Sequence, residues 1–403
     1  KEVAEMISRF LETFEDPKRP LLAPNYWILN KVGLLLPDSK LGKFFFIIIH
    51  EIATLFVLTQ YIELYVIRSD FDLVLTNLRI SMLSTVCIVK SNTLLLNQSK
   101  WKQIIDYVTT ADIFERENRV PDKKNMLDSC TKYCRSVTYF YWVLVFSTVM
   151  TTTSTPLVRV MSSLSYRDEL RNGTELFPHI FSSWMPFDKY HSPGLWITVG
   201  WHIIICVYGA TILGAYDTTV IVMMEFFGIK LELLRARCQM MFGKDESGIS
   251  DDKATKIIQQ LHTIHVKLLE HSRLLNSILS PVMFVYVIIC AFMLCTSAYQ
   301  LTTATSTTQK VFMAEYLIFG IAQLFMFCWH SNKFLVKSQE GMFGPYESNW
   351  WAAGIKQKKL ILMLTEQLKL VHIFSAGPFT NLTVSTFLGI LKGAYSYYTL
   401  LRK

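Results

Sequence analysis

The chain has 403 residues, of which 51% are hydrophobic, 13% aromatic and 18% charged, and its mean hydropathy is +0.30. This composition is too apolar for an ordinary soluble protein of this length. The net charge of +8 comes from basic residues gathered in a few connecting segments, so it gives no argument for nucleic-acid binding.

Seven apolar windows, each long enough to cross a bilayer core of roughly 30 Å, recur along the chain. They cover residues 44–67, 72–96, 133–157, 194–227, 281–300, 311–329 and 378–401. We therefore predict an all-α membrane protein with seven transmembrane helices. The predicted parts are an N-terminal segment at 1–43, helices one to six with their extensions at 44–330, anchor helices at 331–377 and a last helix at 378–403.

Lysine and arginine are distributed unevenly between the connecting segments. The N-terminal segment and the loops after helices two, four and six hold 28 of them, compared with 8 on the opposite side. Because cytoplasmic loops are enriched in basic residues, the N-terminus is predicted to be cytoplasmic and the C-terminus extracellular. A glycosylation sequon at Asn172 in the long second outer loop agrees with this orientation.

The second window contains two basic residues, Arg79 and Lys90. Charge within a bilayer is costly and usually faces protein or water. Two interpretations are open for each residue: its side chain snorkels to the nearer membrane surface, or it lines a wet cavity.

The candidates for metal binding or catalysis are weak. His262, His265 and His271 lie in a stretch predicted to be helical and cytoplasmic, without a cysteine pair or the glutamate of a zinc-protease motif. A role in packing or at the surface explains them better than metal binding. No phosphate loop, nucleophile elbow or intramembrane carboxylate pair is evident, so we expect no enzyme, no cofactor and no metal site.

The last window is preceded by an amphipathic stretch at 358–374 and a Gly-Pro break at 375–378, which predict an anchor helix followed by a new transmembrane helix from residue 378. Together with the extended fourth helix and the helical loop before the fifth, this predicts a packed cytoplasmic bundle. Within the last helix, Gly389, Gly393 and Ser396 share one face, with Tyr397 beside it. Helix packing explains the glycines, whereas a helix that borders a water-filled path also explains the serine and the terminal lysine.

Three stretches resemble the insect odorant receptor family: Tyr-x-Ser-x-Trp at 346–350, "ILKGAYSYYTLL" at 390–401, and "SWMPFDKYHSPG" at 183–194. The resemblance implies a ligand-gated, non-selective cation channel in the plasma membrane of sensory neurons, formed by four subunits whose last helices line a central pore. It also implies that odorant-specific subunits assemble with a shared co-receptor. The short loops at 97–132 and 228–280 make this chain similar to the odorant-specific subunit.

The resemblance to the family's final motif implies that the pore residues of this chain are Gly393, Ser396, Tyr397, Leu400 and Lys403. By that match Leu400 occupies the gate region and Lys403 the polar position just outside it. Four lysines around a pore would repel cations. Our hypothesis is that the chain alone makes a poor pore and that co-receptor subunits supply most of its lining.

The resemblance also implies an odorant pocket in the outer half of the helical domain, among helices two, three, four and six. Small, volatile and mostly apolar ligands require an enclosed, aromatic pocket that is poor in charge. Each candidate also has an ordinary role in packing or at the membrane interface. The candidates are Ile80, Leu83, Phe146, Met150, Trp201, Ile204, Tyr208, Tyr316 and Phe319.

Three alternative functions remain at this point. An insect gustatory receptor, forming a homotetrameric channel, shares the inverted topology. A metabotropic receptor coupled to a G protein requires the opposite orientation. A transporter is expected to show internal repeats or broken helices, and no convincing repeat is present.

Overall fold

A computed structural model describes residues 6, 11–69, 71–117, 121–162, 164–172, 176–243, 250–303 and 307–401. Its helices confirm the predicted all-α class, and a short hairpin of two strands accompanies them. The elements are α2 (Ala23–Lys31), α3 (Lys40–Val66), α4 (Phe71–Leu96), α5 (Gln98–Glu117), α6 (Pro121–Ser162), α7 (Leu164–Arg171), α8 (Gly194–Gln239), α9 (Asp251–Thr303), α10 (Thr307–Glu340), α11 (Phe343–Tyr346), η1 (Trp350–Ala352), α12 (Ile355–Leu368), β1 (Ser375–Ala376), β2 (Thr380–Asn381) and α13 (Val384–Leu401).

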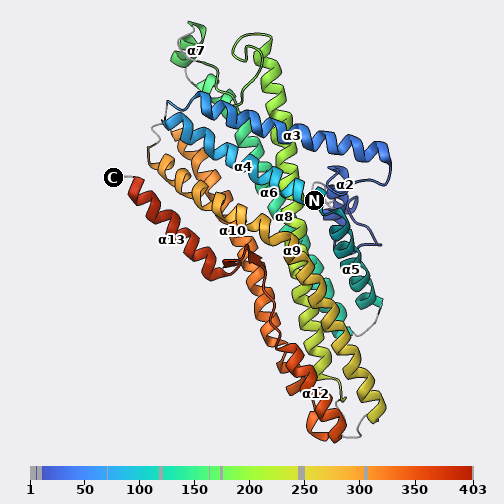
Figure 1. Cartoon of the computed structure of the whole chain (residues 1–403). Helices are drawn as coiled ribbons and strands as arrows, with labels where there is room; N and C mark the ends of the chain where they lie inside the picture. Colours follow the sequence, from blue (N-terminus) through green and yellow to red (C-terminus); the bar gives the residue numbers. More distant parts are fainter. Residues whose placement is uncertain are drawn as a thin grey trace.

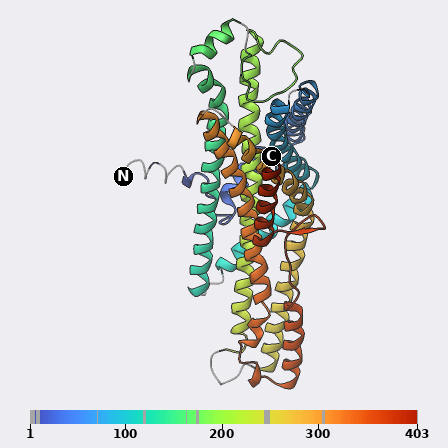
Figure 2. The ribbon, with the colours of Figure 1, turned by 90° about the vertical axis from the view of Figure 1, so that its left-hand side faces the viewer.

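Two very long helices set the shape of the molecule. α8 has 46 residues and α9 has 53, so each is about 70 Å long or longer, more than twice the thickness of a bilayer core. Their lower ends continue beyond the shorter helices and run beside α10 and α12 (Figures 1 and 2). This extension forms the helical bundle that was predicted beneath the membrane.

α8 also forms the centre of the core. Every residue from Ile212 to Gly228 is buried, because α8 packs against α4, α6 and α10 on different sides. A helix that is apolar around its whole circumference is stable only when neighbours surround it. The other helices therefore arrange themselves around α8.

Length and hydropathy identify five membrane-spanning candidates within the described residues: Lys40–Val66, Leu73–Leu96, Gly194–Gln239, Asp251–Thr302 and Lys310–Tyr346. The remaining two predicted windows lie in α6 and α13. Polar and hydroxyl residues interrupt the apolar residues of α6, including the run from Thr151 to Ser154. Its apolar signal is therefore weaker than that of the five.

The last helix begins later than predicted. Residues 375–381 form the antiparallel hairpin of β1 and β2, and α13 begins at Val384 instead of residue 378. Gly377 has a φ of +68°, a conformation that favours glycine, and its amide donates to the Ser280 carbonyl at 3.0 Å. The Gly-Pro break was recognised in the sequence, but its contact with α9 depends on tertiary structure.

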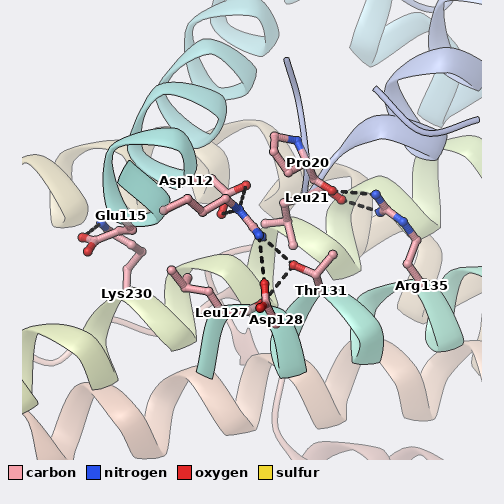
Figure 3. Close-up of polar contacts among 10 residues, drawn as sticks. Pro20, Leu21, Asp112, Glu115, Leu127, Asp128, Thr131, Arg135 and Lys230 are labelled. Carbon is pink, nitrogen blue, oxygen red and sulfur yellow. Dashed lines mark hydrogen bonds and ion pairs between the residues drawn. The ribbon is translucent and has the colours of Figure 1, made fainter. Parts of the chain in front are cut away.

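Charged side chains join the N-terminal segment, α5, α6 and α8 (Figure 3). Glu115 on α5 forms ion pairs with Lys230 and Arg237 on α8, and its side chain is only 1% exposed. Arg135 on α6 donates to the carbonyl groups of Pro20 and Leu21 at 2.6 and 2.7 Å. Ion pairs and charged hydrogen bonds thus connect the N-terminal segment, α5, α6 and α8.

The three histidines that were considered as metal ligands have different surroundings. No group of three or more possible ligands is found among the described residues. His265 is buried, His262 is exposed, and His271 stacks on Tyr107 with 3.8 Å between ring centroids. The structure favours packing and surface roles for them.

His372, between α12 and β1, predicts a pH dependence of stability. Burial lowers its pKa below the ordinary 6.5, and this effect outweighs that of the Ser272 carbonyl, which raises it. As the pH falls below about 6.5, the unfolded chain binds the proton first. The stability that neutral His372 provides is therefore full above that pH and is lost as the pH falls through the lowered value.

We expect the melting temperature of the purified protein to fall between neutral and mildly acidic pH. In a His372→Phe variant, which keeps an aromatic ring against Phe334 and Phe374, that fall should be smaller. An identical pH dependence in both proteins would show that His372 does not contribute.

Candidate functional site

A cavity lies in the outer half of the helical domain, between α3, α4, α6, α8 and α10. The space between the lining residues, counted together with its opening to solvent, is about 840 Å³. It is lined by Ala53, Phe56, Val57, Ile80, Leu83, Ser84, Cys87, Ile88, Ser91, Val145, Thr148, Val149, Thr152, Phe181, Ile205, Cys206, Tyr208, Gly209, Ala210, Ile212, Leu213, Tyr316 and Phe319. None of these described lining residues carries a charge.

The cavity wall is apolar apart from a few hydroxyl groups. Ser84, Ser91 and Thr148 donate to backbone carbonyls one turn earlier on their own helices, at 3.1, 3.1 and 2.9 Å. Their donors are used, but the oxygen atoms keep acceptor capacity. A ligand hydroxyl can therefore donate to them.

Two tyrosines add polar groups that neighbouring side chains hold in place. The Tyr208 hydroxyl lies 2.8 Å from Nδ1 of His50, which is buried behind it on α3. The Tyr316 hydroxyl lies 3.2 Å from that of Thr152. A few fixed polar groups in an apolar wall can orient a small molecule.

The structure brings five of the nine predicted pocket residues together around this cavity: Ile80, Leu83, Tyr208, Tyr316 and Phe319. They come from α4, α8 and α10, which are far apart in the sequence. Tyr316 and Phe319 lie three residues apart on α10, so they share one face, as predicted.

The other four predicted residues do not line it. Phe146, Met150 and Ile204 are 65%, 52% and 63% exposed, because the faces of α6 and α8 that meet the cavity carry Val145, Val149 and Ile205 instead. Consecutive helical residues point about 100° apart, so an error of one residue moves a side chain from the pocket to the outer surface.

Trp201 is the fourth residue outside the lining. It is half-buried and packs against Phe56, with 6.2 Å between ring centroids. Phe56 itself lines the cavity. Trp201 therefore supports the wall from behind.

The outer loop closes the cavity from above. Phe181 of this loop lines the cavity and packs on Phe56 of α3, with ring centroids 5.5 Å apart. Lys189 fixes the loop by donating to Glu63 at 2.7 Å and to the Ser183 carbonyl at 2.9 Å. These loop residues were not among the residues predicted for the pocket.

A buried ion pair forms the floor. Lys90 Nζ lies 2.6 Å from Oδ1 of Asp217, and both side chains are 0% exposed. Oδ2 of Asp217 accepts from the Tyr141 hydroxyl at 2.5 Å and from Gln323 Nε2 at 2.6 Å. Four helices, α4, α6, α8 and α10, thus meet at one carboxylate.

This arrangement differs from both interpretations of Lys90, because the side chain neither snorkels nor lines the cavity. Its Nζ lies 4.9 Å from the ring centroid of Tyr286 and 5.4 Å from that of Phe327, within reach of cation–π attraction. Asp217 was missed, although a lone aspartate in an apolar window is a recognisable signal.

Arg79 is buried near the outer end of α4, at 3% exposure. Its guanidinium lies 4.7 Å from the ring centroid of Tyr316 and next to the sulfur of Met313. Arg79 therefore packs behind a ring that lines the cavity, without being a lining residue itself.

Four of the five predicted pore residues, Gly393, Ser396, Tyr397 and Leu400, belong to α13. This helix packs on α9 and α10 at the side of the molecule (Figure 1). A Cβ atom added at Gly389 or Gly393 would meet nothing within 4 Å, so the glycine face is not used for packing within the described chain. The Ser396 hydroxyl donates to the Lys392 carbonyl at 3.0 Å, and Tyr397 is 66% exposed. The Leu400 side chain and Lys403 lie outside the described residues.

Asn172, the predicted glycosylation site, is exposed just after α7. Gly173 and Thr174, which complete the sequon, lie outside the described residues.

Comparison with known proteins gives the family of this chain. The family model described as 7tm Odorant receptor matches residues 70–395. Among individual proteins, Odorant receptor 10 of Aedes albopictus is 28% identical over 192 residues, covering 46% of this chain and 50% of that protein. Odorant receptor Or2 of Anopheles gambiae is 23% identical over 139 residues, covering 34% and 37%. The chain thus spans half or less of the length of these two relatives.

A solved structure has the same fold. The insect olfactory receptor OR5 from Machilis hrabei, in complex with eugenol, aligns with a TM-score of 0.78 over 93% of this chain and 97% of that one, at 17% identity. The family model covers most of the chain, and the long apolar helices identify a multi-pass membrane protein. The chain belongs to the 7tm odorant receptor family.

Proposed function

We propose that the chain is the odorant-binding subunit of a ligand-gated cation channel in the plasma membrane of sensory neurons. The observation that carries the proposal is the cavity between α3, α4, α6, α8 and α10, whose lining is mainly apolar and carries no charge among the described residues. Such a cavity suits a small, mostly apolar molecule with one polar group. The Machilis receptor of the same fold was solved in complex with eugenol.

The proposed pore is formed by α13 in a tetramer. Its glycine face is uncovered in the single chain, which fits a helix that meets other subunits or a water-filled path. Lys403 follows this helix, and a ring of four lysines would oppose cation flow. We therefore assign most of the pore lining to co-receptor subunits, with monovalent and divalent cations as the permeating ions.

Odorant binding opens the channel only if the ligand contacts the cavity differently in the closed and open states. The residues at the floor of the cavity connect the ligand site to the buried ion pair below it. Leu213 and Phe319 line the cavity one turn or so above Asp217 and Gln323 on the same helices. A shift of these helices around a ligand would be carried to the buried ion pair below.

The test is electrophysiological. The chain is expressed alone and together with an insect co-receptor, G-protein signalling is blocked, and whole-cell current is recorded during application of an odorant panel. We expect fast cation current only in the co-expressing cells. Current from the chain alone would contradict the poor-pore assignment, and loss of the response on blocking G proteins would contradict the channel.

A matched pair of variants on α8 links the current to the cavity. A Cβ atom at Gly209 or at Gly200 meets nothing within 4 Å, but only Gly209 lines the cavity. Gly209→Val should therefore raise the effective odorant concentration about tenfold or more by occupying ligand space. Gly200→Val should leave it unchanged at equal surface expression. Equal responses from both variants would place the ligand elsewhere.

A further inference from the structure

A second, smaller cavity lies beside the first, between α4, α9 and α10. The space between its lining residues, counted together with any opening, is about 410 Å³. Leu83, Tyr316 and Phe319 line both cavities, so these three side chains form the partition between them.

The second cavity contains a buried hydroxyl group that lacks a strong partner. Tyr286 on α9 is 3% exposed, and its hydroxyl makes no hydrogen bond to an oxygen or nitrogen atom of the described residues. The thiol of Cys290 lies beside it, but sulfur is a weak acceptor. A ligand atom that accepts a hydrogen bond from this buried phenol would therefore make binding more favourable.

Gln323 provides a second polar group in the same wall. Its Nε2 donates to Oδ2 of Asp217 at 2.6 Å, so the buried ion pair holds the amide in place. The remaining wall is mainly apolar, with Val86, Met293 and Leu294. The second cavity thus combines a mainly apolar surface with the Tyr286 hydroxyl, whose neighbour is the weakly accepting Cys290 thiol. In the first cavity, by contrast, backbone carbonyls accept from the hydroxyl groups of Ser84, Ser91 and Thr148.

We propose that the second cavity is an inner subsite that receives the oxygen-bearing end of an elongated aliphatic ligand, such as an unbranched ketone. The rest of the chain occupies the first cavity, and a change of rotamer at Leu83 or Phe319 connects the two. Short ligands stay in the first cavity. This assignment rests on the proposed function, and it makes the inner subsite the part of the receptor that selects for chain length and for an acceptor end group.

Two glycines allow each cavity to be reduced separately. Gly320 lines only the second cavity, and its added Cβ would lie 3.3 Å from Leu294 Cδ2, the flexible end of a side chain. Gly209 lines only the first cavity and has nothing within 4 Å. Both lie in helix interiors, so Gly320→Ala and Gly209→Ala make the same chemical change in the two compartments.

The experiment measures binding without channel activity. The purified full-length chain is labelled with a photoreactive, diazirine-bearing long-chain methyl ketone, and unlabelled butanone and decanone compete for labelling. In Gly320→Ala, the decanone concentration needed for half displacement should rise about tenfold, with a change below about twofold for butanone. Gly209→Ala should weaken both ketones.

A third variant tests the end group. Tyr286→Phe removes the hydroxyl and keeps the ring, so it should weaken decanone about fivefold or more and leave the unbranched alkane decane unchanged. Equal weakening of decanone and decane would show that Tyr286 acts by packing alone, and would overturn the acceptor-binding role.

The remaining outcomes separate this inference from the proposed function. Equal effects of Gly320→Ala on butanone and decanone, or adducts confined to residues of the first cavity, would overturn the inner subsite and leave the first cavity as the odorant site. If the unaltered chain showed no saturable labelling in either cavity, the proposed function would fail together with the subsite. Labelling of Met293 or Leu294 that is prevented by excess decanone would support the inner subsite.

Discussion

Replacing Asp217 by asparagine will lower the free energy of unfolding by about 3 to 5 kcal/mol, because it leaves the ammonium group of Lys90 buried without its counter-charge. Lys90 and Asp217 are both 0% exposed, and Nζ lies 2.6 Å from the carboxylate. Asparagine keeps the size of the side chain and one acceptor oxygen, so the loss is mainly electrostatic. We expect much less receptor at the cell surface and a lower melting temperature.

The control is the double variant Lys90→Met with Asp217→Asn. It removes both charges and keeps an unbranched side chain at position 90 among the aromatic rings of Tyr286 and Phe327. Replacing a buried pair by neutral groups of similar size is often close to neutral, so the double variant should recover most of the lost stability. If it were as unstable as Asp217→Asn alone, shape and hydrogen bonding would matter more than charge.

The same pair explains why part of the site could not be predicted from the sequence. The fourth window is recognised by its mean hydropathy, which one aspartate among many apolar residues barely changes. The partner of that aspartate lies 127 residues earlier, on α4, and no local pattern connects the two. Two isolated charges of opposite sign in different windows do predict a pair, and that signal was available.

The pocket shows a second limit of sequence-based prediction. Its depth and four of its five helices were predicted from the family resemblance, and Ile80, Leu83 and Tyr208 do meet there. Which face of α6 and α8 turns inward depends on helix rotation, which packing determines. Phe146 was chosen as an aromatic candidate, whereas its neighbour Val145 lines the cavity. An aromatic side chain does not indicate which helix face turns toward the cavity, because aromatic rings are stable against lipid as well as inside the protein.

The helices themselves were predictable because each apolar window is longer than any strand and matches the bilayer thickness. The hairpin at 375–381 was not, since β1 and β2 have two residues each. Such a short pair exists only because α9 holds it: the Ser375 amide donates to Asn276 Oδ1 at 2.9 Å. Contacts of this kind are absent from any local pattern.

The second large effect is expected in the lower bundle. Glu115→Gln should lower the free energy of unfolding by about 3 to 5 kcal/mol, since Lys230 and Arg237 would both face a neutral amide. The Glu115 and Lys230 side chains are only 1% and 5% exposed, and Arg237 Nη2 lies 2.5 Å from the carboxylate. Water therefore cannot replace the lost charge at Lys230.

Glu117→Gln provides the matched control, because Glu117 lies on the same helix and is exposed. It should change stability by less than about 0.5 kcal/mol, as surface substitutions usually do. Thermal unfolding of the purified proteins compares the two directly. Equal melting temperatures for Glu115→Gln and Glu117→Gln would mean that Glu115 is solvated and that α5 is held to α8 by apolar packing alone. A selective loss at Glu115 would show that the attachment of α5 to the central helix depends on this one carboxylate.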